Sequence, residues 1–285
     1  KIGIKSGERI FFYDDSQNWW SRNGGIKTTP IGDPCGPDSE VFYDFGPQNH
    51  DPKFGLAHPA SDSGRFVEIG NQVFMQYRRK VDGSFDLLEK QNIDFGGGLE
   101  RISAAAIDTP DIFKISLMWP IIEKLEVLSK KKYDFTPGDL GYETIPDCWV
   151  EVMKSMRVIA DHLRAATFLA VDGVVPSNKE QGYVMRRLLR RAIRFALELG
   201  IQQNFMQEVV PVIADMFADD YPEVKEHRDE VIAVLIKEEK VFRQTLQKGL
   251  RELGKYTENG LTGAEIFTLY DTYGFPFELS TEEAS

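Results

Sequence analysis

The chain has 285 residues, of which 34 are Lys or Arg and 45 are Asp or Glu, so its formal net charge is −11. This charge argues against a protein that coats nucleic acid with a basic surface, and 42% hydrophobic with 28% charged residues excludes disordered and collagen-like classes. The apolar runs are too short to span a bilayer, and the first residues lack the apolar core of a signal peptide.

Residues 1–108 are rich in glycine, proline and aromatic residues and contain short runs typical of strands. Strands are predicted at 10–13, 40–45 and 65–79, and an Asp82-Gly83 turn precedes a further strand at 84–88. Because short turns join these strands, we expect an antiparallel sheet. Residues 94–106 then predict a glycine-rich loop that passes into a helix.

From residue 109 onward apolar residues recur at three- and four-residue steps, which is typical of amphipathic helices. Helices are predicted around 152–166, on 185–196 with an end near Gly200, and over 222–253. Ser177 and Glu180 match a capping box and predict a helix start. The fold class is therefore α+β, with a sheet domain at 1–108 followed by a helical domain at 109–285.

The cysteines and histidines do not suggest a metal site or a covalent framework. Cys35 and Cys148 are the only cysteines, no C-x-x-C occurs, and the four histidines are scattered. We therefore expect no zinc site in this segment and a reduced, cytoplasmic protein without a membrane partner. Because the chain begins with Lys1 and reaches dense motifs within about twenty residues, we also expect it to be part of a longer protein.

A basic stripe is predicted on one helix. Segment 154–194 holds nine Lys/Arg and three Asp/Glu, so this +6 patch lies within a remainder of −17. Five arginines within nine residues favour an anion such as phosphate, or acidic neighbours such as the glutamates of the 222–253 helix. Charge alone leaves both interpretations open. The stripe consists of Arg186, Arg187, Arg190, Arg191 and Arg194.

A second candidate site is the segment Gly96–Arg101 (GGGLER). Glycines allow a backbone to approach a ligand closely, the following helix start offers free N–H groups, and Arg101 can bind phosphate oxygens. The segment matches neither a Walker loop nor a Rossmann fingerprint. Asp94 could hold a cationic group or simply end a strand. Asn178 and Asp271 could equally be cap or turn residues.

Six segments together resemble the alanyl-tRNA synthetase family of class II in order and spacing. They are Asn18–Trp20 (NWW), Gly32–Tyr43 (GDPCGPDSEVFY), Glu68–Gln76 (EIGNQVFMQ), Asp94–Ile102 (DFGGGLERI), Arg157–Arg194 and Leu269–Pro276 (LYDTYGFP). The resemblance implies an antiparallel class II catalytic domain, incomplete at its N-terminus, followed by a helical tRNA-recognition domain. Class II motifs 1 and 2 and an editing domain are expected elsewhere in the same protein.

The resemblance also implies roles for individual residues. Arg101 of motif 3 would bind the ATP γ-phosphate beside Gly96 and Gly98, and Asp94 would bind the α-ammonium of alanine. The alanine pocket would consist of Trp20, Val73 and Gly96, with Asn71 as a polar contact. Asn178 and Asp271 would read the G·U pair of the tRNA(Ala) acceptor stem, and the arginine stripe would contact stem phosphates.

The implied activity is that of an alanine–tRNA ligase, which forms alanyl-adenylate from alanine and ATP with Mg²⁺ and transfers alanine to tRNA. The metal ligands are not assigned. The alternative is a non-catalytic fragment or paralogue that binds acceptor-stem RNA, and we expect the 285-residue chain by itself to be inactive. The chain departs from the family at three positions, with Asp38 for a cysteine, Gly70 for a frequent tryptophan and Phe95 for a frequent threonine.

Overall fold

A computed structural model of the chain describes residues 3–61, 63–134, 146–253 and 261–273, apart from the side chains of residues 250, 253 and 270–273. The chain divides into two compact units, Lys1–Ile115 and Ser116–Ser285. Among the described residues the first contains a sheet, one α-helix and short 3₁₀ helices, and the second contains the other α-helices. The α+β class predicted from the sequence is confirmed.

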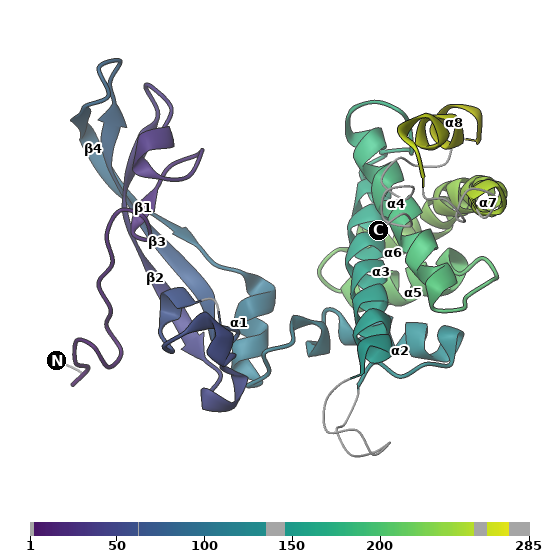
Figure 1. The fold of residues 1–285 in the computed structure, drawn as a ribbon, viewed down its shortest axis with the longest axis horizontal. Helices are drawn as coiled ribbons and strands as arrows, with labels where there is room; N and C mark the ends of the chain where they lie inside the picture. Colours follow the sequence, from purple (N-terminus) through teal and green to yellow (C-terminus); the bar gives the residue numbers. More distant parts are fainter. Residues whose placement is uncertain (1–2, 62, 135–145, 254–260, 274–285) are drawn as a thin grey trace. The chain divides into compact units, whose positions relative to one another are not determined.

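The first unit is built on a four-stranded antiparallel sheet in the order β1-β2-β3-β4 (Figure 1). Its strands are β1 (Trp19–Trp20), β2 (Pro34–Asp44), β3 (Phe66–Arg79) and β4 (Phe85–Gly96). The Asp82-Gly83 turn joins β3 to β4, and the backbone N–H of Lys80 donates to the carbonyl of Ser84 across it at 2.8 Å. Alternating side chains and this turn explain why β3 and β4 pair along most of their length.

Two expectations for this unit need correction. The strand predicted at 10–13 is absent: Ile10 makes only an isolated bridge with Ser6, and the Phe12 side chain is 81% exposed. An apolar run with no neighbouring strand has no ladder to join. Conversely, β4 extends through Gly96, so the predicted loop from residue 94 shortens to the two glycines before the next helix.

Helix α1 (Leu99–Ala106) follows this loop and packs against β3. It buries Ala104 and Ala105 beside the sheet. Five short 3₁₀ helices complete the unit: Ile26–Thr28, Pro47–Asn49, Pro52–Phe54, Pro59–Ser61 and Ile112–Lys114.

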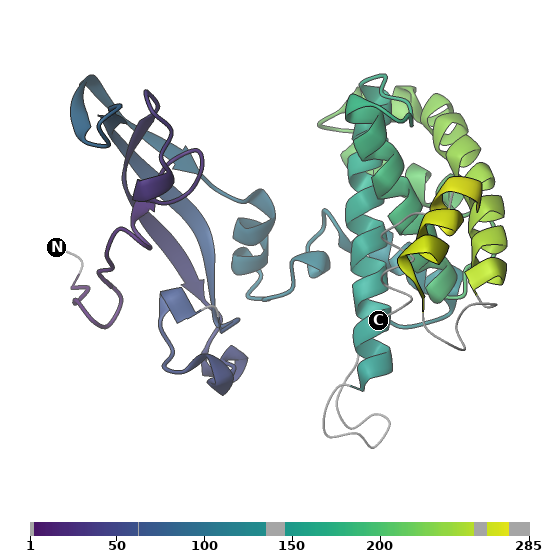
Figure 2. The same ribbon diagram turned by 45° about the horizontal axis from the view of Figure 1, so that its top comes forward.

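The second unit consists of packed helices. They are α2 (Trp119–Ser129), α3 (Asp147–Val171), α4 (Glu180–Glu198), α5 (Met206–Phe217), α6 (Pro222–Glu226), α7 (Arg228–Leu253) and α8 (Gly263–Tyr273). Helices α3 and α4 run side by side and make the most extensive contact between helices (Figure 2). Their apolar stripes, which include Met156, Leu163, Met185 and Leu189, are fully buried. None of the helices in the described ranges has the length and hydropathy to cross a membrane.

The predicted helices at 152–166 and 185–196 are confirmed within α3 and α4. The predicted helix over 222–253 is instead two helices, because His227 leaves helical geometry between them. The break places Asp229 and Glu230 in the first turn of α7, where negative charge is favourable. The capping box was also wrong. The N-cap of α4 is Lys179, which has no side-chain cap, and the Ser177 hydroxyl accepts from the N–H of Lys179 instead.

A buried ion pair ties α7 to the start of α5. The Glu239 carboxylate accepts from the Arg243 Nε at 3.0 Å and from the backbone N–H groups of Phe205 and Met206. Arg243 also donates to the carbonyl of Ile201 at 3.2 Å. Because both side chains are buried and multiply hydrogen-bonded, α7 is held in one position beside the loop that precedes α5.

Candidate functional sites

The pairing of β3 with β4 brings together four residues that were predicted to share a site. Val73 lies opposite Asp94, and Asn71 lies opposite Gly96. Because side chains alternate along a strand, positions 71 and 73 face the same side of the sheet, as do positions 94 and 96. Their partners on β2, Glu40 and Asp38, extend the same face. Val73 is buried, whereas Asp94 and Gly96 are exposed.

This face carries an excess of carboxylates. The Asn71 Nδ2 donates to Oδ2 of Asp38 at 3.0 Å and to Oε1 of Glu40 at 3.2 Å. Burial raises the pKa of Glu40, and the neighbouring charges of Glu68 and Asp38 raise that pKa further. The Oδ1 atoms of Asp38 and Asn71 are buried and have no hydrogen-bond partner among the described residues. These two buried oxygens therefore have unused acceptor capacity on a face that is rich in carboxylates.

Arg101 lies at the start of α1, directly after the glycine loop. Its Nη1 donates to the carbonyl oxygen of Glu68 at 3.2 Å and to Oε2 of Glu68 at 3.1 Å. The side chain is half exposed, and its aliphatic stem covers Gly98, the N-cap of α1. A half-exposed guanidinium at a helix N-terminus can exchange such a carboxylate for a phosphate.

The register does not bring Trp20 into this group. Trp20 lies on β1 opposite Gly36, and β2 separates it from β3. Its neighbour Trp19 packs instead on the rings of Tyr77 and Phe85, with ring centroids 6.0 and 5.3 Å apart.

In the helical unit the five arginines of the stripe divide into two sets, and Arg186, whose Nε lies 3.6 Å from Oε1 of Glu238, belongs to the set with acidic partners. Arg190 Nε donates to Oε1 of Glu238 on α7 at 2.8 Å, and Arg194 pairs with Glu198 at 3.1 Å. Arg187 and Arg191 are exposed and have no ion-pair partner in the described part of the chain. Acidic neighbours thus satisfy part of the stripe, and two guanidinium groups one turn apart remain available to an anion.

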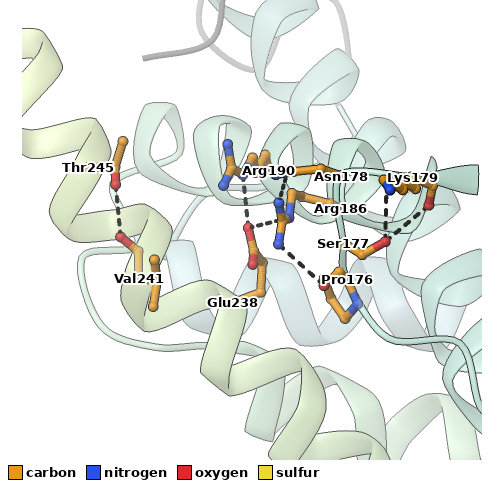
Figure 3. Close-up of polar contacts among 9 residues, drawn as sticks. All are labelled: Pro176, Ser177, Asn178, Lys179, Arg186, Arg190, Glu238, Val241 and Thr245. Atoms are coloured by element: carbon orange, nitrogen blue, oxygen red, sulfur yellow. Dashed lines mark hydrogen bonds and ion pairs between the residues drawn. The ribbon is translucent and has the colours of Figure 1, made fainter. Parts of the chain in front are cut away.

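The loop before α4 is held closely against the first turn of that helix (Figure 3). The Ser177 N–H donates to the carbonyl of Gly182 at 3.0 Å. A Cβ atom at position 182 would lie 2.6 Å from the Val175 carbonyl oxygen and would also collide with the Ser177 hydroxyl, so only glycine fits. Asn178 is exposed at the end of this loop, and its Oδ1 accepts from Nη1 of Arg186.

The sequence did not identify some of the site residues, and the side chain of one predicted residue lies outside the described part of the chain. Glu68 was not singled out, because no spacing rule links it to Arg101. Glu238 was foreseen only as one of several glutamates on an acidic helix. Asp271 lies in α8, but its side chain and residues 274–276 of its motif are outside the described residues.

Comparison with known proteins reveals similarity along the whole chain. The model of the family "tRNA synthetases class II (A)" matches residues 1–285. Alanine–tRNA ligase of Bacillus subtilis (strain 168) is 39% identical over 292 aligned residues, covering 100% of this chain and 30% of that protein. The enzymes of Geobacillus thermodenitrificans (strain NG80-2) and Francisella tularensis subsp. mediasiatica (strain FSC147) are 41% and 38% identical, covering 88% and 99% of this chain. The chain spans about 30% of the length of these curated relatives.

Proposed function

The chain belongs to the alanyl-tRNA synthetase family of class II, and we propose that the polypeptide carrying these 285 residues is an alanine–tRNA ligase. The observation that carries the proposal is the β3–β4 register, which sets Val73 opposite Asp94. Asp94 lies near the end of β4, just before the glycine loop that leads to Arg101. An apolar side chain can pack against the methyl group of alanine, a carboxylate can bind its ammonium group, and a guanidinium can bind a phosphate of ATP.

In the proposed reaction an oxygen of the alanine carboxylate attacks the α-phosphorus of ATP. The new O–P bond gives alanyl-adenylate, and the bond to the β-phosphate breaks to release pyrophosphate. A terminal ribose hydroxyl of tRNA then attacks the alanyl carbonyl and releases AMP. Asp94 binds the ammonium group, Val73 packs against the methyl group, and Arg101 binds the γ-phosphate. Their contribution is positioning and charge neutralisation.

The residues also fit a magnesium-dependent nucleotide site. Among the described residues no three His, Cys, Asp or Glu side chains are arranged to hold a metal alone. Mg²⁺ in nucleotide sites is generally held by one or two carboxylates together with substrate phosphates, where it neutralises their charge. Glu68 fits this role, because its carboxylate contacts Arg101, the side chain proposed to bind phosphate.

The helical unit supplies the second half of the proposal. Asn178 would contact base edges in the shallow minor groove of an acceptor stem, with Arg187 and Arg191 on its phosphates. Asp271 would accept from an exposed guanine amino group. Arg186, Arg190 and Arg194 would stabilise this surface through their acidic partners and add to its positive potential.

The test is alanine-dependent ATP–pyrophosphate exchange by the polypeptide that carries these residues, together with aminoacylation of tRNA(Ala). We expect exchange with alanine, and Arg101→Gln should reduce it by at least about tenfold, since a charge-assisted contact contributes about 1.5–3 kcal/mol. Arg22→Gln is the matched control, because Arg22 is an exposed arginine of the same unit whose partner is Asp33. Stem binding without any exchange would instead support a non-catalytic RNA-binding protein.

A further inference from the structure

Arg186 connects three parts of the helical unit (Figure 3). Its Nη1 donates to Oδ1 of Asn178, its Nη2 donates to the Pro176 carbonyl at 3.3 Å, and its Nε lies 3.6 Å from Oε1 of Glu238. The guanidinium of Arg186 thus connects the loop before α4 with the Glu238 side chain of α7. The planar fork of arginine suits this arrangement, since its N–H groups have fixed directions.

The contact with Arg186 determines which way the Asn178 carboxamide is turned. A guanidinium has donors only, so the atom of Asn178 that faces it must be the oxygen. The Nδ2 group of Asn178 has no partner within the described ranges, and the residue is exposed. The side chain therefore has a free donor while its oxygen is already engaged.

Glu238 holds Arg186 from the opposite side. Its side chain is only 9% exposed, and a carboxylate so buried needs cationic partners. Arg190 and Arg186, which lie four residues apart on α4, both reach Oε1 of this carboxylate. Because α7 is itself anchored through Glu239, the position of Glu238 is set by the core of the unit.

We propose that Arg186, held by Glu238, fixes Asn178 so that it presents its amide N–H₂ to an RNA base acceptor. The inference rests on the proposed function and specifies its chemistry. A freely rotating carboxamide could turn either its donor or its acceptor toward RNA, whereas this one has its oxygen against Arg186 and its N–H₂ group unengaged. Its partner in an RNA minor groove is a purine N3 or a pyrimidine O2. Arg186 and Glu238 are positioning residues that act through Asn178.

The experiment measures binding of the 285-residue chain to two short RNA hairpins that differ only in a G·U or a G·C pair at one stem position. Asn178→Ala should reduce the preference between them roughly five- to tenfold, the value of one hydrogen bond. Asn178→Asp should do the same, because it keeps the contact with Arg186 but has no donor. Arg186→Lys and Glu238→Gln should also reduce the preference, with unfolding temperatures measured alongside.

The matched control is Arg228→Lys, at a partly exposed arginine in the first turn of α7 whose ion-pair partner is Asp229. It keeps the positive charge and has no link to Asn178, so the preference should persist. A second measurement alters the RNA instead of the protein. In one G·U hairpin 3-deazaguanosine, which lacks N3, replaces the guanosine; in another 2-thiouridine, whose sulfur is a weak acceptor in place of O2, replaces the uridine. One of these should weaken binding of the unaltered chain roughly five- to tenfold and leave binding of Asn178→Ala unaffected.

The results distinguish failure of the positioning role of Arg186 and Glu238 from failure of the proposed RNA-reading role of Asn178. If Asn178→Ala abolishes the preference but Arg186→Lys and Glu238→Gln preserve it, the positioning inference is overturned and the RNA-reading role remains. Full preference in Asn178→Asp would overturn the assignment of a donor. If Asn178→Ala keeps the preference, the role of Asn178 in the proposed function is itself wrong.

Discussion

Val73 and Asp94 lie directly opposite each other on β3 and β4, one buried and the other exposed. Opposed residues in an antiparallel pair have Cβ atoms about 5 Å apart. That spacing suits a small amino acid, because one carbon separates its ammonium group from its methyl group. The pair thus sets a charged and an apolar group at the spacing that the proposed contact with alanine requires.

Asp94→Asn should weaken alanine binding while leaving the fold intact. The charge-assisted contact to an ammonium contributes about 1.5–3 kcal/mol, so the KM for alanine in ATP–pyrophosphate exchange should rise by about ten- to a hundredfold. The unfolding temperature should not change, because Asp94 is exposed. Asp86→Asn is the control, since Asp86 is an exposed carboxylate of the same strand. An equal rise in KM for both variants would contradict the assignment.

Glu40→Gln should stabilise the protein at neutral pH. Burial and the charges of Glu68 and Asp38 raise the pKa of Glu40 in the folded state. A carboxyl group with a raised pKa binds its proton more tightly when folded. Its contribution to stability is therefore fully present below the unfolded pKa of about 4.3 and is lost as the pH rises through the raised value. Above the raised value the ionised group destabilises the fold, and glutamine removes that cost.

Thermal unfolding measured between about pH 4 and pH 8 checks this sign. The unfolding temperature of Glu40→Gln should exceed that of the unaltered chain at the upper end, and the difference should shrink as the pH falls. Glu89→Gln, at an exposed position on β4, should show no such trend. A difference that grows toward low pH would mean that Glu40 is stabilised as a carboxylate.

Gly70 and the exposed ring of Phe95 lie close together on the other face of the sheet. A Cβ atom at position 70 would lie 3.0 Å from the Phe95 Cε2, and one at position 97 would lie 3.0 Å from the same ring. Gly70→Ala should therefore be less favourable in the unaltered chain than in a Phe95→Ala background by about 1 kcal/mol of unfolding free energy, as a double-mutant cycle in urea would measure. Gly96→Ala, where a Cβ would meet no atom within 4 Å, is the control. Equal costs of Gly70→Ala in both backgrounds would exclude the coupling.

This pair accounts for two departures from the family that the sequence revealed but could not explain. A tryptophan side chain at position 70 would overlap the ring of Phe95. A large side chain at position 95 on β4 therefore requires a small residue at position 70 on β3. The sequence placed Gly70 in a strand, because alternation and the Asp82-Gly83 turn determine the β3–β4 hairpin locally, but it placed Phe95 in a loop that the structure shows to be the end of β4. Which side chains share a volume depends on the register between strands, and composition does not specify it.

Long-range pairing was likewise beyond the sequence. Arg190 and Glu238 are 48 positions apart, and their contact requires α4 and α7 to pack in one particular way. The amphipathic stripes predicted both helices but left open whether the arginines faced phosphate or glutamate. Ser177 was misjudged for a related reason. Its spacing to Glu180 suited a cap, whereas the packing of its loop over Gly182 turns the hydroxyl toward Lys179.

The division of the arginine stripe predicts two different salt responses in RNA binding. Each arginine that neutralises a phosphate contributes about 0.7 to 0.9 to the slope of log affinity against log salt concentration. Arg187→Gln should therefore lower the slope by about that amount without changing the unfolding temperature, because its side chain is exposed. Arg190→Gln should leave the slope nearly unchanged and lower the unfolding temperature, since it removes the 2.8 Å partner of the buried Glu238 carboxylate. Titrations of a stem hairpin at several salt concentrations measure the slopes, and equal slopes for the two variants would mean that Arg190 leaves Glu238 to bind RNA.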